Sequence, residues 1–265
     1  MEPLCHRAHA SCGACCGIYN RRQLSRDAVD AVLARRTTAL ACVPRTLEAF
    51  RSTAARLCEG EDPPLFPSVQ ICPLLGYLDE AHTRVGCLGH PLATGGTDLR
   101  DAGAYGASTC GCFFCPSHAW LSEEEADLVA DVCGPDPYLY GLVVTDVPFV
   151  RAALAAVASL AGRRVERRHR AHAPFKDALA RVLALKEELA PGSDGLFGAF
   201  RPGEHGEPLP RTIDHDALGR AAASCYDELL TCVGADPRSG NDLAVLEEEV
   251  RRRLEACAAA LPEPP

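Results

Sequence analysis

The sequence predicts a mainly α-helical fold in which a Cys-rich, loop-heavy region is packed on amphipathic helices. Two observations predict it. Eleven of the 15 cysteines lie within the first 115 residues, and nine of these fall in Gly- and Pro-rich stretches, which are typical of loops and turns. After Trp120, apolar residues recur at the spacing of helices and follow clear start signals. We therefore divide the chain into a Cys-rich region, residues 1–118, and a helical region, residues 119–265.

Two helices are expected to interrupt the loops of residues 1–118. One covers residues 25–42 and the other residues 45–58. Their apolar side chains fall on one face at helical spacing. These inward residues are Ala28, Val29, Val32 and Leu33 in the first helix, and Leu47, Phe50, Ala54 and Leu57 in the second.

The first helix of the second region should begin after Ser122. Ser122 is a good N-cap, and Glu125 completes a capping box. Gly134 and Pro135 should end this helix just after Cys133. We expect further helices over residues 149–160, 174–189, 214–233 and 242–260, and a short strand over residues 142–145.

The charge of the chain argues against nucleic acid as a partner. The formal net charge is −9, and an acidic chain repels a phosphate backbone. A basic run over residues 163–170 is better explained as a solvated helix end whose cations complement the helix dipole.

The sequence also argues against secretion and membrane insertion. Its first residues contain no apolar stretch of the kind that a secretory signal needs. The most apolar run, residues 152–161, is about half of the ~20 residues that span a bilayer. We therefore expect a cytoplasmic protein with no membrane partner.

Fifteen cysteines in a cytoplasmic chain indicate metal binding. Reducing thiols keep cytosolic disulfides rare, so clustered cysteines there more often bind metal. Residues 1–118 also have long loops and few large apolar side chains to offset the entropy of ordering them. A bound metal could supply that missing stabilisation.

Three local patterns carry this prediction. The first is Cys12-Gly13-Ala14-Cys15-Cys16-Gly17, where a Cys-x-x-Cys turn places two thiolates on one metal. Cys16 points elsewhere in most backbone conformations, toward a second metal or, through a special turn, the same cluster. The second pattern joins Cys72-Pro73 to Cys87 and His90. The third is Cys110-Gly111-Cys112-Phe113-Phe114-Cys115-Pro116. Two distant Cys-x-x-Cys pairs can close one tetrahedral site, and the surplus thiols indicate a second site or a cluster.

These stretches resemble a known family. The matching segments are residues 12–17, Cys-Pro-Leu-Leu-Gly at 72–76, Val-Gly-Cys-Leu-x-His-Pro at 85–91, and Gly-Gly-Thr-Asp-Leu-Arg-Asp at 95–101 leading to Cys110 and Cys115. Together they resemble the CxxCxxCC family of zinc- or iron-chelating domains, over residues 5–118. The resemblance implies metal binding but no particular reaction. By matching position it implies the metal ligands Cys12, Cys15, Cys16, Cys72, Cys87, Cys110 and Cys115.

The chain departs from the family pattern at one position. The family has a Cys three residues before the position of Cys12, and here that residue is His9. Either His9 binds the metal through a ring nitrogen, which zinc accepts, or Cys5 takes that role. A second tier of candidate ligands is therefore Cys5, His9, His90 and Cys112. His90 could instead hydrogen-bond a ligand sulfur, and Cys112 could be a bystander.

Other residues receive structural roles. Asp98, Arg100, Asp101 and Tyr105 belong to the resembling stretch and either orient ligands or organise a loop. Six cysteines fall at or near apolar helical positions, where Cys behaves as a small buried hydrophobic residue. They are Cys42, Cys58, Cys133, Cys225, Cys232 and Cys257.

The sequence leaves the function open among three classes. The first is a metal-binding protein with a cage for zinc or an iron–sulfur cluster, in a structural or metal-handling role. The second is an iron–sulfur-dependent redox or transferase enzyme, which the surplus thiols favour. The third is a zinc-stapled module that binds an unidentified protein partner. Neither a Walker-type phosphate loop nor a Gly-x-Ser-x-Gly elbow is present, so no enzyme class is indicated.

Overall fold

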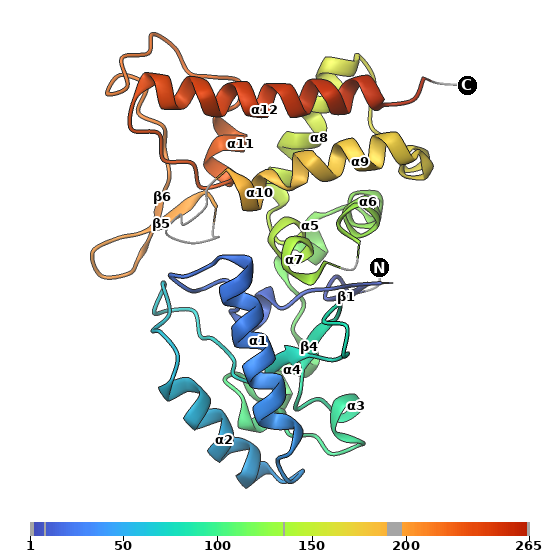
Figure 1. The fold of residues 1–265 in the computed structure, drawn as a ribbon, viewed down its shortest axis with the longest axis vertical. Coiled ribbons are helices and arrows are strands. Elements are labelled where there is room, and N and C mark those ends of the chain that lie inside the picture. The colour runs from blue at the N-terminus through green and yellow to red at the C-terminus, as the bar shows by residue number, and fades with distance from the viewer. Residues whose placement is uncertain (1–2, 8, 135, 190–197, 264–265) are drawn as a thin grey trace.

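The computed structural model describes residues 3–7, 9–134, 136–189 and 198–263. It is mainly helical, with 53% helix and 6% strand, so the predicted fold class is confirmed. Figure 1 shows α1 (Arg26–Ala41) and α2 (Leu47–Glu59) at one end of the molecule, and α12 (Gly240–Ala260) across the other end. The N-terminus lies between the two ends, beside the middle helices of the chain.

The remaining described elements are mostly short. The other α-helices are α3 (Pro91–Thr94), α4 (Gly106–Cys112), α5 (Pro116–Trp120), α6 (Glu123–Cys133), α7 (Pro137–Val144), α8 (Val147–Ala161), α9 (Ala173–Leu183), α10 (Leu185–Glu188) and α11 (Asp227–Cys232). The 3-10 helices are η1 (Ala14–Cys16), η2 (Arg100–Ala102) and η3 (Arg167–Ala171). The strands form antiparallel pairs: β1 (His6–Arg7) with β2 (Ala10–Ser11), β3 (Leu75–Tyr77) with β4 (Val85–Cys87), and β5 (Phe200–Pro202) with β6 (Pro208–Pro210).

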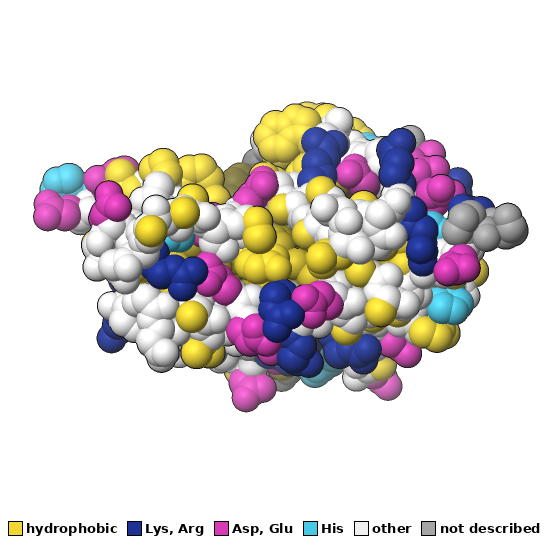
Figure 2. Space-filling model, turned by 90° about the horizontal axis from the view of Figure 1, so that it is seen from above, with side chains coloured by type: hydrophobic (Ala, Val, Ile, Leu, Met, Phe, Trp, Pro, Cys, Tyr) yellow, Lys and Arg dark blue, Asp and Glu magenta, His cyan; other side chains and the backbone are white. Residues whose placement is uncertain are grey.

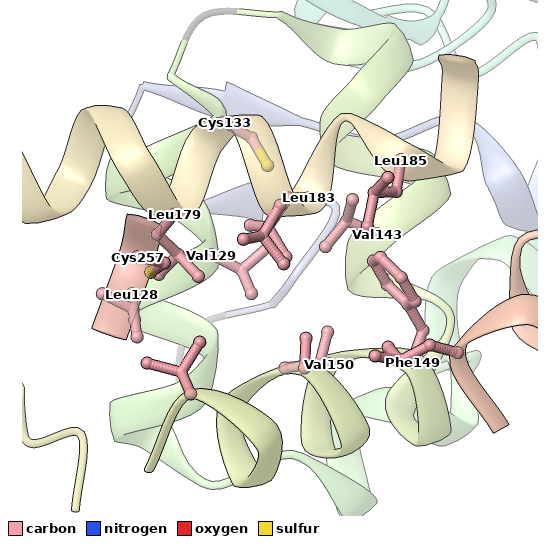
Figure 3. Packing of buried hydrophobic residues seen from close by; sticks show 14 of the residues in the cluster. Leu128, Val129, Cys133, Val143, Phe149, Val150, Leu179, Leu183, Leu185 and Cys257 are labelled. Atoms are coloured by element: carbon pink, nitrogen blue, oxygen red, sulfur yellow. The ribbon is translucent and has the colours of Figure 1, made fainter. Parts of the chain in front are cut away.

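The largest buried cluster belongs to the helices after Trp120. α12 packs on α8 and α9, and α6 packs on α7 and α9. Figure 3 shows side chains of α6, α8 and α9 meeting in this core, among them Val129, Val150 and Leu183. Leu4, which precedes β1, and Ala10 of β2 are buried in the same cluster. Apolar burial on this scale is the main stabilising contribution to the fold.

Two smaller buried clusters lie in the Cys-rich region, and one of them reaches across residue 118. It packs Tyr19 and Val29 against Tyr138 and Leu142 of α7. The Tyr19 hydroxyl donates to the Tyr138 carbonyl at 2.9 Å. The two regions of the chain are therefore joined by buried apolar and polar contacts.

The stronger helix predictions are confirmed. α1, α2 and α12 fall within two residues of the expected bounds. Ser122 caps α6, and Glu125 completes the predicted capping box.

Two element predictions were wrong. Residues 142–145 belong mostly to α7 and not to a strand, because Asp136 accepts the N–H groups of Tyr138 and Leu139 and Pro137 occupies the first turn. A short run of apolar residues cannot distinguish these outcomes. The helix predicted over residues 214–233 is reduced to α11, since Gly219 adopts φ +67° and ends a single turn.

Among the described residues, no single helix is long and apolar enough to cross a bilayer, and α7 with α8 would reach that length only as a pair bent by 86°.

Candidate metal centre

The Cys12–Gly17 segment forms a tight turn that is bonded to a distant loop. η1 ends at Gly17, which adopts φ +77°. A Cβ atom on Gly17 would overlap the carbonyl oxygen of Gln70, so only glycine allows this approach. The Cys72 amide donates to the Cys16 carbonyl at 2.8 Å. Cys16 and Cys72 are thereby held side by side.

The β3–β4 pair brings a third cysteine to this place. Leu75 pairs with Cys87 in the ladder, and the Leu88 amide donates to the Leu74 carbonyl at 2.8 Å. Cys87 therefore lies across the hairpin from the segment that follows Cys72. Cys72 is buried, and Cys16 and Cys87 pack against the same buried cluster.

Cys110 reaches the same place from α4. The sequence predicts a loop here, and this prediction is wrong, because the Asp101 carboxylate accepts the Ala107 amide at 2.7 Å in the first turn of the helix. Arg100 is held by Asp98 at 2.6 Å, and its positive charge lowers the pKa values of Cys87 and Cys110 against the larger, opposite effect of burial.

A second group of thiols gathers on the other side of the turn. The Cys12 amide donates to the Cys5 carbonyl at 3.2 Å, which continues the β1–β2 pairing. The Cys15 thiol is hydrogen-bonded to Cys115, the residue that precedes α5. Cys12 and Cys115 both pack against the large helical cluster.

The thiols therefore form two sets of four. The first set is Cys5, Cys12, Cys15 and Cys115. The second set is Cys16, Cys72, Cys87 and Cys110. Besides burial, which is the largest cause, neighbouring thiols raise one another's pKa: charge on Cys115 acts on Cys5 and Cys12, and charge on Cys72 acts on Cys16, Cys87 and Cys110. The two sets are also coupled to each other, because charge on Cys12 raises the pKa of Cys16 and charge on Cys16 raises that of Cys15.

Burial keeps most of these thiols protonated when no cation is near. It is the largest cause that raises the pKa of Cys12 to about 12 and that of Cys87 to about 11. The Cys15–Cys115 pair behaves differently, because the two thiols share one proton. Their interaction lowers the pKa of Cys115 and raises that of Cys15. A divalent cation would reverse the effect of burial, since it favours the thiolate form.

Backbone N–H groups are directed at the sulfur atoms of both sets. The Ala14 amide donates to Cys12 Sγ at 3.4 Å. Backbone N–H groups of Gly89 favour the Cys87 thiolate, and those of Ser117 and His118 favour the Cys115 thiolate. In Cys12, Cys87 and Cys115 the donor lies two residues beyond the cysteine. Hydrogen bonds of this kind stabilise charged sulfur and tune metal–thiolate centres.

Three second-tier candidates lie outside both sets. His9 Nε2 lies 3.1 Å from the Ala130 carbonyl oxygen. His90 Nδ1 accepts the Leu92 amide at 3.2 Å and caps α3. The Cys112 thiol contacts the Ser108 carbonyl at 3.2 Å, within its own helix. Of the two alternatives at the departure from the family pattern, the structure places Cys5, and not His9, with the other thiols.

The donors of each set fit a metal by type and number. Four cysteine thiolates can complete a structural zinc site, and four can also hold an iron–sulfur cluster. Over the described residues, no three His, Cys, Asp or Glu side chains converge at metal-binding distance. The structure therefore supports a metal site only through which cysteines lie in the same part of the fold, and not through a formed set of ligands.

Supporting residues that sequence reasoning missed surround the second set. Arg36 is buried and donates from Nη1 to the Cys72 carbonyl at 2.9 Å. A Cβ atom on Gly103 would lie 2.9 Å from Cys72 Sγ. An Arg in a helix gives no local signal of burial. The acidic residue that neutralises Arg36, Glu61, is 25 positions away.

The remaining cysteines divide into two groups. Cys133, Cys232 and Cys257 are buried as predicted, and Figure 3 shows the sulfur atoms of Cys133 and Cys257 in the helical core. The prediction was wrong for three that are exposed: Cys42, Cys58 and Cys225. Cys42 follows the last residue of α1, Cys58 lies on the outward face of α2, and Cys225 precedes α11 in a turn.

The basic run over residues 163–170 is not a helix end, because α8 stops at Ala161. Arg167 and Arg170 each lie 3.2 Å from a carboxylate oxygen of Asp127. Figure 2 shows basic and acidic side chains intermixed over the face that carries α12.

Three comparisons with known proteins gave no match: no family model, curated protein or solved structure is significantly similar to the chain. The resemblance to the CxxCxxCC family stays a hypothesis that depends on the cysteine pattern.

Proposed function

We propose that the protein binds metal through its Cys-rich region, which holds zinc or an iron–sulfur cluster in a structural or metal-handling role. One observation carries the proposal: backbone hydrogen bonds and shared buried clusters bring cysteines from segments far apart in the sequence to the same parts of the fold. All seven cysteines implied by the resemblance are among the eight thiols of the two sets, together with Cys5.

The energetics support a bound cation. Buried thiols without a cation resist ionisation, and each added thiolate repels the others. A metal ion attracts each thiolate and so offsets the repulsion between them. Its binding free energy then adds to the folding free energy of the loops that supply the ligands. Residues 60–74 join α2 to β3 without a described helix or strand, so they would gain most from such a link.

Metal analysis of the purified chain tests the proposal. Protein purified without oxygen should contain at least one zinc ion or one iron–sulfur cluster per chain. A zinc protein is colourless, whereas a cluster gives brown colour and charge-transfer absorption. Less than about a tenth of an equivalent of any transition metal, with the thiols paired as disulfides, contradicts the proposal.

Matched cysteine variants test whether the first set binds metal. Cys15→Ser and Cys115→Ser should release metal. Cys112 lies three residues before Cys115 but outside both sets, so the Cys112→Ser variant should retain metal. Cys257→Ala should also retain metal and cost roughly 1 kcal/mol in packing. Equal metal loss from all four variants would show that the first set does not bind the metal.

A cavity favours a second candidate, an iron–sulfur-dependent redox or transferase enzyme. It has a volume of about 500 Å³ and is lined by residues of α2, Gln70, Pro73 and Gly103. Pro73 and Gly103 are also neighbours of Cys72, so a small molecule in this cavity would lie close to the second set. The test is reversible bleaching of the visible absorption by dithionite. A colourless protein with zinc in both sets excludes this candidate.

A further inference from the structure

We infer that a groove along α2 binds a small aliphatic carboxylate, with the carboxylate on Arg51 and the hydrocarbon chain along the groove floor. The groove is the cavity of about 500 Å³ introduced above, and α2 lies at one end of the molecule (Figure 1). Its walls are one face of α2, the segment between α2 and β3, and residues 102–104 at the end of η2. Such a site is a function beyond metal binding and does not require a bound metal.

The floor of the groove is aliphatic. Among the residues that line it, Ala54 and Ala102 are buried, and Val69 and Ile71 are half-buried. The segment between α2 and β3 adds four prolines, whose rings fix the backbone and reduce the entropy lost on binding. None of the described lining residues is aromatic. These walls therefore suit an alkyl chain, which gains affinity with the apolar area that it buries.

The charge at the groove favours an anion at one end. Arg51 is the basic residue among the described lining residues, and its hydrogen bond to the Asp101 carbonyl is long, at 3.4 Å. No ion pair holds this guanidinium in the described part of the chain, so it is free to bind a carboxylate through two parallel hydrogen bonds. The Glu61 carboxylate does not oppose this, because three arginines already neutralise it. Asp62 follows the other end of α2, where an uncharged chain end is not repelled.

Helix geometry sets the length of the ligand. Arg51 and Cys58 both line the groove and lie about two turns apart on α2, a distance of about 10 Å. An extended alkyl chain that starts at Arg51 is covered over this length. Each methylene buried there should raise the affinity by about two- to fourfold. A longer chain extends into water, and its additional methylenes should add nothing.

A series of chain lengths tests the inference on the purified full chain. Butyrate, hexanoate, octanoate, decanoate and dodecanoate are titrated by isothermal titration calorimetry, below the concentrations at which they form micelles. The affinity should rise by about two- to fourfold per methylene and level off near octanoate. Octanol has the same chain without the charge, so it should bind about threefold more weakly than octanoate.

Two variants test the two ends of the recognition. Arg51→Gln should bind octanoate and octanol equally, because it loses only the contact with the carboxylate. Ala55 is an exposed lining residue of α2, so Ala55→Phe should fill the groove and weaken both ligands by at least about tenfold. The control is Arg56→Gln, which changes an exposed arginine of the same helix outside the lining and should behave as the wild type. Circular dichroism checks that each variant is folded.

Three results would overturn the inference. They are no octanoate binding by the folded wild type, equal wild-type affinity for octanoate and octanol, and an affinity that still rises from decanoate to dodecanoate, which indicates general adsorption. Metal content is measured on the same samples. A chain that binds octanoate but carries no metal contradicts only the proposed function, whereas a chain that carries metal but binds no octanoate contradicts only the carboxylate site.

Discussion

Replacing Arg36 with Met should destabilise the native chain by about 3 kcal/mol, because Arg36 is a fully buried cation at the centre of a charge network. Its side chain is 0% exposed, and it donates to Glu61 from Nε at 2.8 Å and from Nη2 at 2.6 Å. Its third donor bonds the Cys72 carbonyl at 2.9 Å.

The magnitude follows from what the substitution leaves behind. Removing one partner of a buried ion pair costs about 3–5 kcal/mol when the other charge is left alone. Glu61 keeps ion pairs with Arg21 and Arg35, so the cost falls below this range, to about 2 kcal/mol. Met fills much of the volume, but the Cys72 carbonyl loses its donor, which adds about 1 kcal/mol.

Arg35→Met is the matched control. Arg35 bonds the same carboxylate at 2.9 Å from the adjacent position of α1, but its side chain is 42% exposed. Its loss should cost no more than about 0.5 kcal/mol. Urea unfolding followed by circular dichroism compares the two variants. With an m-value of about 3 kcal/mol/M, the Arg36→Met midpoint should fall by about 1 M and the Arg35→Met midpoint by less than about 0.2 M. Equal shifts, or an Arg36→Met shift below about 0.3 M, would refute the assignment of Arg36 as a buried structural cation.

Three further predictions concern other parts of the chain. In thermal unfolding, Gly17→Ala should destabilise the protein by more than Gly95→Ala. Both positions have a positive φ, which costs alanine about 1 kcal/mol, but only at Gly17 would the new side chain overlap the Gln70 carbonyl. Equal losses of stability would contradict this. Burial raises the pKa of Glu61, but the guanidinium groups of Arg36, Arg21 and Arg35 lower it more, so the net pKa is lowered. The stability advantage of the wild type over Glu61→Gln should therefore be full at pH 7, above the unfolded pKa, and shrink as pH falls through the lower folded value; an advantage that is constant with pH would contradict this. Ser122→Ala should lower the free energy of unfolding by about 1 kcal/mol, measured from the urea midpoint, because it removes the side-chain hydrogen bond of the α6 capping box. An unchanged midpoint would show that this cap does not contribute to stability.

The helical elements with strong start signals were predictable, and the weaker ones were not. Ser122 and Glu125 predict the start of α6, because helix capping depends on residues within one turn. Residues 142–145 could not be assigned locally, since their apolar side chains suit a strand or a buried helix equally well. The signal that settles the outcome is Asp136-Pro137, a cap and a first-turn proline that precede the apolar run.

The candidate ligands were predictable as a list but not as a grouping. Spacing and resemblance selected the cysteines, because a Cys-x-x-Cys turn is a local feature of the chain. Cys112 belongs to such a spacing, yet its thiol contacts a carbonyl of α4. The direction of the Cys112 side chain depends on its position in α4, and the sequence predicts a loop for this segment.

The sequence by itself determined the fold class, the helix starts and the residue types that could bind metal, because periodicity, capping and thiol chemistry are local properties. Only the tertiary structure decided that Cys5 lies beside Cys12 and His9 does not, that Cys15 is exposed while Cys16 packs against buried clusters, and that Arg36 is buried against Glu61. The physical reason is that each of these outcomes depends on contacts between segments far apart in the chain. Such contacts form only where apolar burial and paired charges together offset the entropy of bringing those segments together.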